Sequence, residues 1–289
     1  MIRLDAATVM LQWATGGLFF LWITTRRREV GLGYGWLLRG VYGMFAAAAA
    51  VVGIRYGSIP GREASAVATA VTAFAVLAVS VTRRRAGVSG HDAEFDRRSA
   101  RVAAMTGIER SGAAAAGRVG REFPPVLDLV APAVAVPGLV VGALDAAGSG
   151  VGAALVSLLR VLAGAAFLGA VTDAMLLGHW YLTQPGLPRR HLNDLVNALG
   201  WVWPVEVGAL LLPTGMVSVL NGSIDDQWNG TLGWMWVACV VTTIGLVWVT
   251  RRALRERYYS AVMAATGLLY LAILTAFGTD LVARAVLAG

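Results

Sequence analysis

The chain has 289 residues, of which 57% are hydrophobic and only 14% are charged. This composition, with a mean hydropathy of +0.66, excludes an ordinary water-soluble protein and predicts an integral membrane protein. Basic residues outnumber acidic residues by 24 to 17, a balance that would suggest nucleic-acid binding in a soluble protein. In a membrane protein, Arg-rich loops retained in the cytoplasm account for the same excess, so we expect no nucleic-acid partner.

Two further features of the composition bear on the source and the chemistry. All the basic residues are Arg, and Ala, Val and Gly are abundant, as is typical of proteins encoded by a high-GC bacterial genome. The single cysteine, Cys239, lies in an apolar stretch, which excludes an internal disulfide and a cysteine-based metal site. The sequence has no glycine-rich phosphate-binding loop and no HExxH or GxSxG motif.

Long apolar stretches recur along the whole chain. An apolar helix of about 20 residues is long enough to cross a hydrocarbon core about 30 Å thick. We therefore predict an all-α, polytopic membrane protein with about eight transmembrane helices. Pro132 and Pro137 are expected to break the fourth helix, and Pro204 and Pro213 the sixth. The predicted helices occupy residues 6–25, 34–54, 64–82, 126–144, 151–182, 192–220, 231–250 and 260–282.

The Arg residues are distributed unequally between the two sets of alternating loops. Nineteen of the 24 lie in or beside the loops that follow the first, third, fifth and seventh helices. The opposite side holds only Arg3, Arg55, Arg62 and Arg284, and Arg160 falls inside the fifth helix. Because Arg-rich loops stay in the cytoplasm, we expect a protein of the bacterial cytoplasmic membrane with both termini outside.

The longest loop, residues 83–124, separates three transmembrane helices (1–82) from five (125–289). It is rich in Arg, and Phe95, Val102 and Met105 recur in it at roughly helical spacing. This pattern predicts an amphipathic helix on the membrane surface, where Arg would meet anionic lipid headgroups. A docking surface for a soluble protein partner is the alternative.

The first and second sets of four helices share short sequence similarities. Residues 16–24 and 164–172 align as Gly-rich apolar runs that end in Thr, and Gly35-Trp36 matches Gly200-Trp201. The chain is therefore predicted to contain two tandem four-helix halves, although apolar helices also resemble one another by chance. In a true repeat, a site at the interface between the halves would be expected.

Three ionisable residues inside the predicted helices stand out, because an unpaired charge is costly there. Arg160 and Asp173 fall in the fifth helix, and Glu206 falls in the sixth, two residues after Pro204. One interpretation is a structural Arg160–Glu206 pair that joins two helices. The other is a proton or ion pathway, or a ligand contact.

The densest group of reactive side chains is expected at the cytoplasmic junction of the fifth and sixth helices. It comprises Asp173, His179, Trp180, Tyr181 and His191. An interfacial aromatic belt explains the rings, whereas a neutral imidazole beside them would suit a quinone headgroup. A b-type haem is disfavoured because the two His residues flank a turn instead of facing each other in a bundle. Zinc is disfavoured because a third ligand is missing.

Three functions follow from these patterns. The first is a membrane subunit of a respiratory or energy-metabolism complex, which would anchor protein partners and give quinone access without catalysing a reaction alone. The second is a small-solute or ion transporter, indicated by Glu206 and the Pro-containing sixth helix. The third is a lipid-modifying enzyme, for which the sequence offers no nucleophile or acidic metal-binding cluster.

Overall fold

The computed structural model describes residues 5–90, 100, 120–184, 186–213, 215–256 and 258–287. Within these residues the chain is helical and contains no strand. Three short elements connect longer ones: η1 (Arg84–Ala86), η2 (Pro125–Leu129) and α8 (Gly215–Leu220). The long helices are α1 (Ala6–Thr25), α2 (Leu32–Tyr56), α3 (Pro60–Thr82), α5 (Val130–Ala146), α6 (Val151–Trp180), α7 (Arg190–Leu211), α9 (Thr231–Ala253) and α10 (Tyr259–Leu287).

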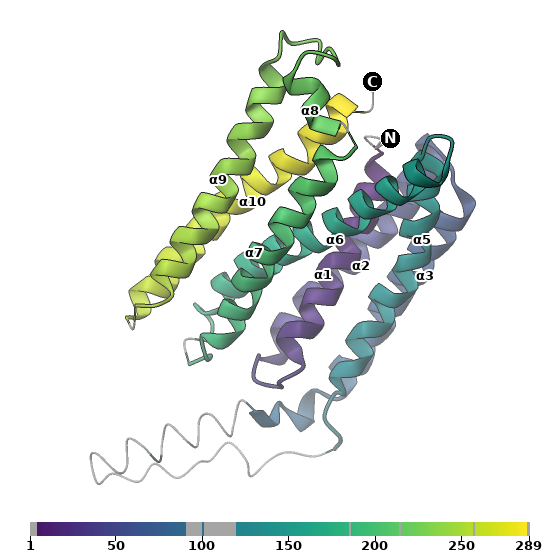
Figure 1. The fold of residues 1–289 in the computed structure, drawn as a ribbon. Helices are drawn as coiled ribbons and strands as arrows, with labels where there is room; N and C mark the ends of the chain where they lie inside the picture. Colours follow the sequence, from purple (N-terminus) through teal and green to yellow (C-terminus); the bar gives the residue numbers. More distant parts are fainter. Residues whose placement is uncertain are drawn as a thin grey trace.

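The prediction of an all-α polytopic membrane bundle is confirmed. Seven helical segments in the described part of the chain are long and apolar enough to cross a bilayer. The remaining long helix, α7, has 22 residues and lies among the others (Figure 1), but polar residues in its first half, including His191, Asn193 and Asp194, lower its hydropathy. The bundle therefore has seven to eight spans.

The long helices form two four-helix halves, as predicted. The N-terminal half comprises α1, α2, α3 and α5, and the C-terminal half comprises α6, α7, α9 and α10 (Figure 1). In each half every helix packs against the next one along the chain, and the fourth packs back against the first. The same order of contacts thus occurs twice, and the origin of the halves by duplication stays a prediction.

The two halves meet mainly along α1 and α6, which cross at small residues. A Cβ atom on Gly16 would overlap the backbone carbonyl of Ala165, and one on Gly169 would overlap the backbone of Gly16. The two main chains therefore touch without intervening side chains. Such close approach is typical of membrane helices that associate through small residues.

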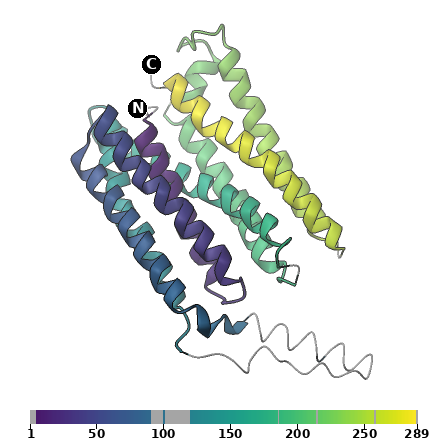
Figure 2. The ribbon, with the colours of Figure 1, turned by 180° about the vertical axis from the view of Figure 1, so that it is seen from behind.

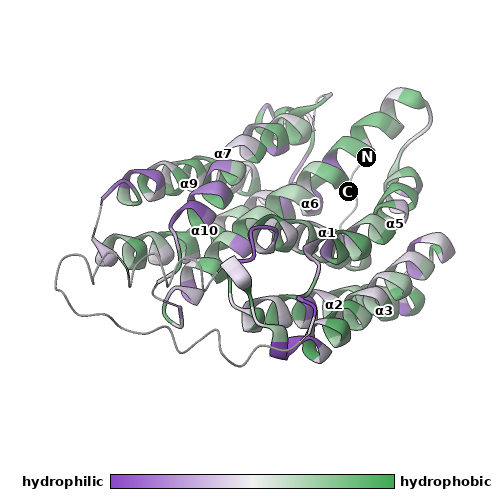
Figure 3. Cartoon of the chain, turned by 90° about the horizontal axis from the view of Figure 1, so that it is seen from below, coloured by the Kyte–Doolittle hydropathy of each residue, from purple (hydrophilic) through white to green (hydrophobic). Residues whose placement is uncertain are grey.

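The two ends of the bundle differ in charge. Both termini and α8 lie at one end, which we call the terminal end (Figures 1 and 2). The opposite end carries the loops with residues 26–28, 83–85, 189–190 and 251–252, and we call it the Arg-rich end. Figure 3 views the molecule from below: hydrophilic segments lie in connecting loops and on parts of α7 and α9, while the helices are otherwise predominantly hydrophobic.

The proline predictions were only partly correct. Helix α5 begins at Val130 and continues through Pro137, and α7 continues through Pro204, so neither helix is broken there. The loss of one main-chain hydrogen bond is tolerated in membrane helices because neighbouring groups satisfy the freed carbonyl. Only Pro213 coincides with an end, since α7 stops at Leu211 and α8 follows as a separate turn. The surface helix predicted around Phe95, Val102 and Met105 lies outside the described residues.

Candidate functional site

A cluster of polar side chains lies inside the bundle, towards its terminal end, where the two halves meet. Every member is at most 4% exposed. The side chains come from one helix of the N-terminal half and three helices of the C-terminal half. We call this group the polar cluster; its members are Gln12 of α1, Arg160 of α6, Glu206 of α7, and Asp280 and Arg284 of α10.

Arg284 is the centre of the hydrogen bonds within the polar cluster. Its Nε donates to Asp280 Oδ2 at 2.7 Å, one helical turn earlier on α10. Its Nη2 donates to Gln12 Oε1 at 2.7 Å. The guanidinium thereby neutralises Asp280 and joins the C-terminal half to α1.

Arg160 makes a different kind of contact from the one predicted. Its Nε donates to the carbonyl of Ala209 at 3.0 Å, and its Nη2 donates to the carbonyl of Leu212. Carbonyls at a helix C-terminus lack partners in their own helix, which explains why they attract the guanidinium. Arg160 and Glu206 are close enough to interact electrostatically, but the predicted direct pair is replaced by these backbone contacts.

Several polar atoms of the cluster have no hydrogen-bond partner among the described residues. They are Gln12 Nε2, both carboxyl oxygens of Glu206, and Asp280 Oδ1. The Glu206 and Asp280 carboxyl groups nevertheless lie within interaction range of each other. Buried polar groups in folded proteins are almost always paired, so four unpaired atoms in one place indicate a site for a proton, a water molecule or a ligand.

The glycine at position 164 gives the polar cluster its space. A Cβ atom there would overlap the Gln12 amide nitrogen and would lie 3.1 Å from Asp280 Oδ1. Any larger side chain at this position of α6 would therefore displace Gln12 or Asp280.

A cavity of about 790 Å³ at the terminal end reaches the edge of the polar cluster. Its lining includes Asp5, Arg62, Asp145, Ser157 and Arg284. Because Arg284 lines the cavity and also bonds to Asp280, it forms the boundary between the cavity and the buried carboxyl groups. The cavity thus extends from the terminal end to Arg284, beside the polar cluster.

Arg62 organises the mouth of this cavity. Its guanidinium pairs with Asp5 and with Glu63 Oε1 at 2.6 Å, and it donates to Thr8 Oγ1 at 3.1 Å and to the Gly57 carbonyl at 2.7 Å. Asp5 also caps the N-terminus of α1 by accepting from two backbone N–H groups. These contacts hold α1, α2 and α3 together around the opening.

The residues predicted to form a quinone site do not converge. Asp173 is completely buried and accepts a hydrogen bond from Tyr42 in the core. His179 lies on the exposed side of α6, where Nδ1 is 3.3 Å from the Tyr270 hydroxyl. Trp180 donates to Gln184 Oε1 at 3.1 Å, whereas the buried Tyr181 donates to the Pro188 carbonyl at 2.7 Å.

His191 belongs to a network that joins the halves at the Arg-rich end. Its Nε2 is 2.6 Å from Glu29 Oε2, and Arg190 forms an ion pair with the same carboxylate. Burial would raise the pKa of Glu29, but the hydrogen bonds from His191 and Arg190 outweigh it and lower the pKa below 4.5. We call these three residues the Glu29 network; Arg27 and Asp194 add an ion pair of 3.0 Å beside it.

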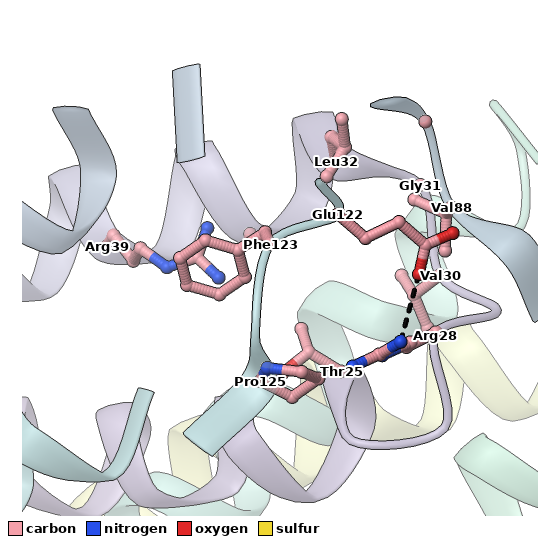
Figure 4. A pocket seen from close by; sticks show the side chains of 12 residues that line it. Thr25, Arg28, Val30, Gly31, Leu32, Arg39, Val88, Glu122, Phe123 and Pro125 are labelled. Carbon is pink, nitrogen blue, oxygen red and sulfur yellow. Dashed lines mark hydrogen bonds and ion pairs between the residues drawn. The ribbon is translucent and has the colours of Figure 1, made fainter. Parts of the chain in front are cut away.

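Another buried ion pair lies in the N-terminal half, between Arg39 and Asp128. Arg39 Nε and Nη2 donate to the two oxygens of Asp128 at 2.7 and 2.9 Å. Thr25 donates to Asp128 Oδ2 at 2.8 Å, and the ring of Phe123 covers the guanidinium, 4.5 Å from its carbon (Figure 4). The adjacent cavity, about 30 Å³, holds no more than about one water molecule. This arrangement leaves no carboxyl oxygen unpaired and is structural.

No protein-family model, curated protein or solved structure matches this chain. Among the described residues, no group of three or more His, Cys, Asp and Glu side chains is placed to hold a metal ion. The polar cluster is therefore the feature of the described residues that points to a function.

The sequence analysis missed three members of the polar cluster: Gln12, Asp280 and Arg284. Asp280 offered a signal, since it is an acidic residue within the predicted eighth helix, four residues before an Arg. Residues four apart share a helix face, so this pair could have been predicted. Gln12 could not, because its role depends on which helix α1 packs against.

Proposed function

We propose that this protein is an ion transporter that moves protons across the membrane by way of the Glu206 and Asp280 carboxyl groups. The observation that carries the proposal is the Glu206 carboxyl, which is fully buried beside Asp280 and receives no hydrogen bond from the described residues. Ionisable groups inside a membrane, facing the interior of the bundle, are typical of proton relays.

A proton satisfies this site better than a metal cation would. A hydrogen on Glu206 can be donated to Asp280 Oδ1, so that one proton pairs two groups that otherwise lack partners. Two neighbouring carboxyl groups that share one proton are a recognised arrangement. A metal cation would meet repulsion from Arg160 and Arg284, and the unpaired Gln12 Nε2 is a donor that cannot coordinate it.

The cavity and the Glu29 network indicate from which end of the bundle a proton can reach the carboxyl pair in this conformation. The 790 Å³ cavity connects the terminal end with Arg284, next to the carboxyl pair. At the Arg-rich end, Glu29, Arg190 and His191 join the loop after α1 to the start of α7. We infer a conformation that is accessible from the terminal end and closed at the Arg-rich end.

The test is proton flux into liposomes that contain the purified protein and a pH-sensitive dye, driven by an imposed membrane potential. Proton flux should be faster in liposomes with the wild-type protein than in protein-free liposomes. In the Glu206→Gln variant this flux should be at least about ten-fold lower than in wild type. Glu256→Gln, at an exposed position, is the matched control and should behave as wild type. Wild-type flux in both Glu206→Gln and Asp280→Asn would overturn the proposal.

The orientation in the membrane is part of the proposal. We propose that the Arg-rich end faces the cytoplasm of a bacterium and that both termini lie outside, because Arg-rich loops are retained on the cytoplasmic side. Single cysteines at Ser89 and Ser223, introduced after replacement of Cys239, should react with membrane-impermeant reagents from opposite sides. Labelling from the same side would contradict this topology.

A quinone-binding membrane subunit of a respiratory complex is the second candidate, favoured by the contact between His179 and Tyr270. His179 lies on the exposed surface of α6, 3.3 Å from the Tyr270 hydroxyl. When Tyr270 donates to Nδ1, the hydrogen of His179 is on Nε2, which can donate to a quinone carbonyl. Protein partners would then supply the redox centres. Purified protein that contains no quinone, or His179→Ala protein that retains all of it, would exclude this function.

A further inference from the structure

We propose that Asp173, together with Tyr42, forms a second proton-binding site, which exchanges protons with the Arg-rich side of the bundle. The inference rests on the proposed proton transport and adds the residue that would receive the proton beyond the polar cluster. Asp173 is fully buried, Oδ1 accepts a hydrogen bond from the Tyr42 hydroxyl, and Oδ2 has no partner among the described residues.

The surroundings of Asp173 favour an exchangeable proton over a fixed charge. No Arg or His in the described part of the chain forms an ion pair with its carboxyl group; the titratable groups that face it are the hydroxyls of Tyr42 and Tyr34. Tyr34 donates to the backbone carbonyl of Asp173 at 3.5 Å, so Tyr42 is the hydroxyl donor to the carboxyl group. A buried carboxylate with a single hydroxyl donor is poorly stabilised, so its neutral form becomes accessible and Oδ2 can carry the proton.

The contact between Tyr42 and Asp173 depends on a gap in α1. Gly17 lies against the Tyr42 ring, and a Cβ atom at this position would overlap the ring. The absence of a side chain at Gly17 therefore lets Tyr42 reach from α2 past α1 to α6. This arrangement involves three helices and places a hydroxyl on one carboxyl oxygen while the other stays unpaired.

The position of Asp173 suits a second step in the same pathway. It follows Gly164, which borders the polar cluster, by nine residues on α6, or about 13 Å along the helix axis towards the Arg-rich end. Trp13, next to Gln12 on α1, donates to Thr172 Oγ1 at 2.9 Å, next to Asp173. Adjacent residues of α1 thus contact the polar cluster and the residue that precedes Asp173. Because about 13 Å exceeds hydrogen-bond reach, transfer between the sites requires water or a movement of α1.

The experiment compares Asp173→Asn with Glu206→Gln in the same proton-flux assay. Asp173→Asn keeps an oxygen that accepts from Tyr42 but cannot bind and release a proton, so flux should fall at least about ten-fold. Asp225→Asn, at an exposed position of the 221–230 loop, is the matched control and should retain wild-type flux. Tyr42→Phe should retain flux with an altered pH dependence, because the carboxyl group remains and only its hydroxyl donor is lost.

The outcomes separate the second site from the polar cluster. Normal flux in Asp173→Asn with loss in Glu206→Gln would overturn the Asp173 site and leave the proposed function intact. Loss in Asp173→Asn with normal flux in both Glu206→Gln and Asp280→Asn would instead remove the polar cluster from the pathway. If Asp173→Asn does not fold, infrared spectra of wild type and Tyr42→Phe across a pH titration test whether Asp173 binds and releases a proton. A carboxyl C=O band that titrates and shifts when the Tyr42 hydroxyl is removed supports the site, and the absence of such a band overturns it.

Discussion

Two groups of buried charges in this bundle, the Arg39–Asp128 pair and the polar cluster, each contain an Arg–Asp pair and differ in how completely their carboxyl groups are paired. In the N-terminal half, Asp128 receives hydrogen bonds from Arg39 and Thr25 on both of its oxygens. In the polar cluster, Arg284 satisfies one oxygen of Asp280, while the other oxygen and the whole carboxyl group of Glu206 lack partners in the described structure.

This difference separates a structural ion pair from a candidate functional site. A buried ion pair with all its hydrogen bonds joins helices in one arrangement, and removing either partner strongly lowers the stability of the fold. A buried carboxyl group without donors adds little to stability and can exist with or without a proton. The two groups should therefore respond in opposite ways to mutation: the first through stability, the second through transport.

The largest loss of stability is expected for Asp128→Ala, which leaves Arg39 buried without its carboxylate. Removing one partner of a buried ion pair typically costs about 3–5 kcal/mol. The thermal unfolding temperature of the purified protein in detergent should fall strongly, with Asp225→Ala in an exposed loop as the control. A change as small as the control's would show that the Arg39–Asp128 pair does not hold the N-terminal half together.

A smaller loss is expected for Gly164→Ala, because the added methyl group would overlap the Gln12 amide. Adding one methyl group to a tightly packed protein interior should lower the free energy of unfolding by about 1–3 kcal/mol. Proton flux should decrease as well, since Gln12 and Asp280 must move. Gly267→Ala on α10, where nothing lies within 4 Å of the new Cβ atom, is the matched control for unfolding temperature and flux. Equal results for the two variants would contradict the close packing around Gly164.

The Glu29 network should add a pH-dependent contribution to stability. The pKa of Glu29 is lowered in the folded protein, so the network stabilises the fold fully above its ordinary value of 4.5. This contribution is lost as the pH falls below 4.5 and through the folded-state pKa. Unfolding temperatures measured from pH 7 to pH 3 should therefore decrease less in Glu29→Gln than in wild type. Parallel curves for the two proteins would contradict the network.

The smallest effect on stability is expected for Glu206→Gln, although its effect on flux is large. The Gln amide can donate to Asp280 Oδ1, which lacks a partner in the wild type. The free energy of unfolding should change by no more than about 1 kcal/mol, the net value of one hydrogen bond. A loss as large as that of Asp128→Ala would place Glu206 with the structural ion pairs.

Helix positions were largely predictable from the sequence because they depend on apolar length alone. The first helix was predicted at residues 6–25, as observed, and the seventh at 231–250, against Thr231–Ala253. Backbone N–H and C=O groups inside a bilayer must pair with one another, so an apolar segment that crosses it forms a helix. Proline effects were overestimated because the surroundings, and not the residue alone, decide whether a helix breaks.

The functional residues were less predictable because they depend on helix rotation and on which helices are neighbours. Asp173 and His179 are six residues apart, or about 1.7 turns, so they point to different sides of α6. Their spacing in the sequence alone therefore places the two residues on different sides of the helix. The contact of Gln12 with Arg284 and that of Glu29 with His191 required the packing of α1 beside the C-terminal half, which no local pattern encodes.

The contact of α1 with α6 at Gly16 and Gly169 can act as a pivot between the two halves. Because the main chains touch there, α1 cannot move closer to α6 at this point, and a tilt of α1 would pivot about the contact. The two residues lie at different distances from the pivot: Gln12 is about 6 Å from Gly16 along α1, and Thr25 is about 13 Å from it in the other direction. A tilt that displaced Thr25 by about 4 Å would move Gln12 by about 2 Å. That is enough to break its hydrogen bond with Arg284, so separation at one end of α1 would be transmitted to the carboxyl groups near the other.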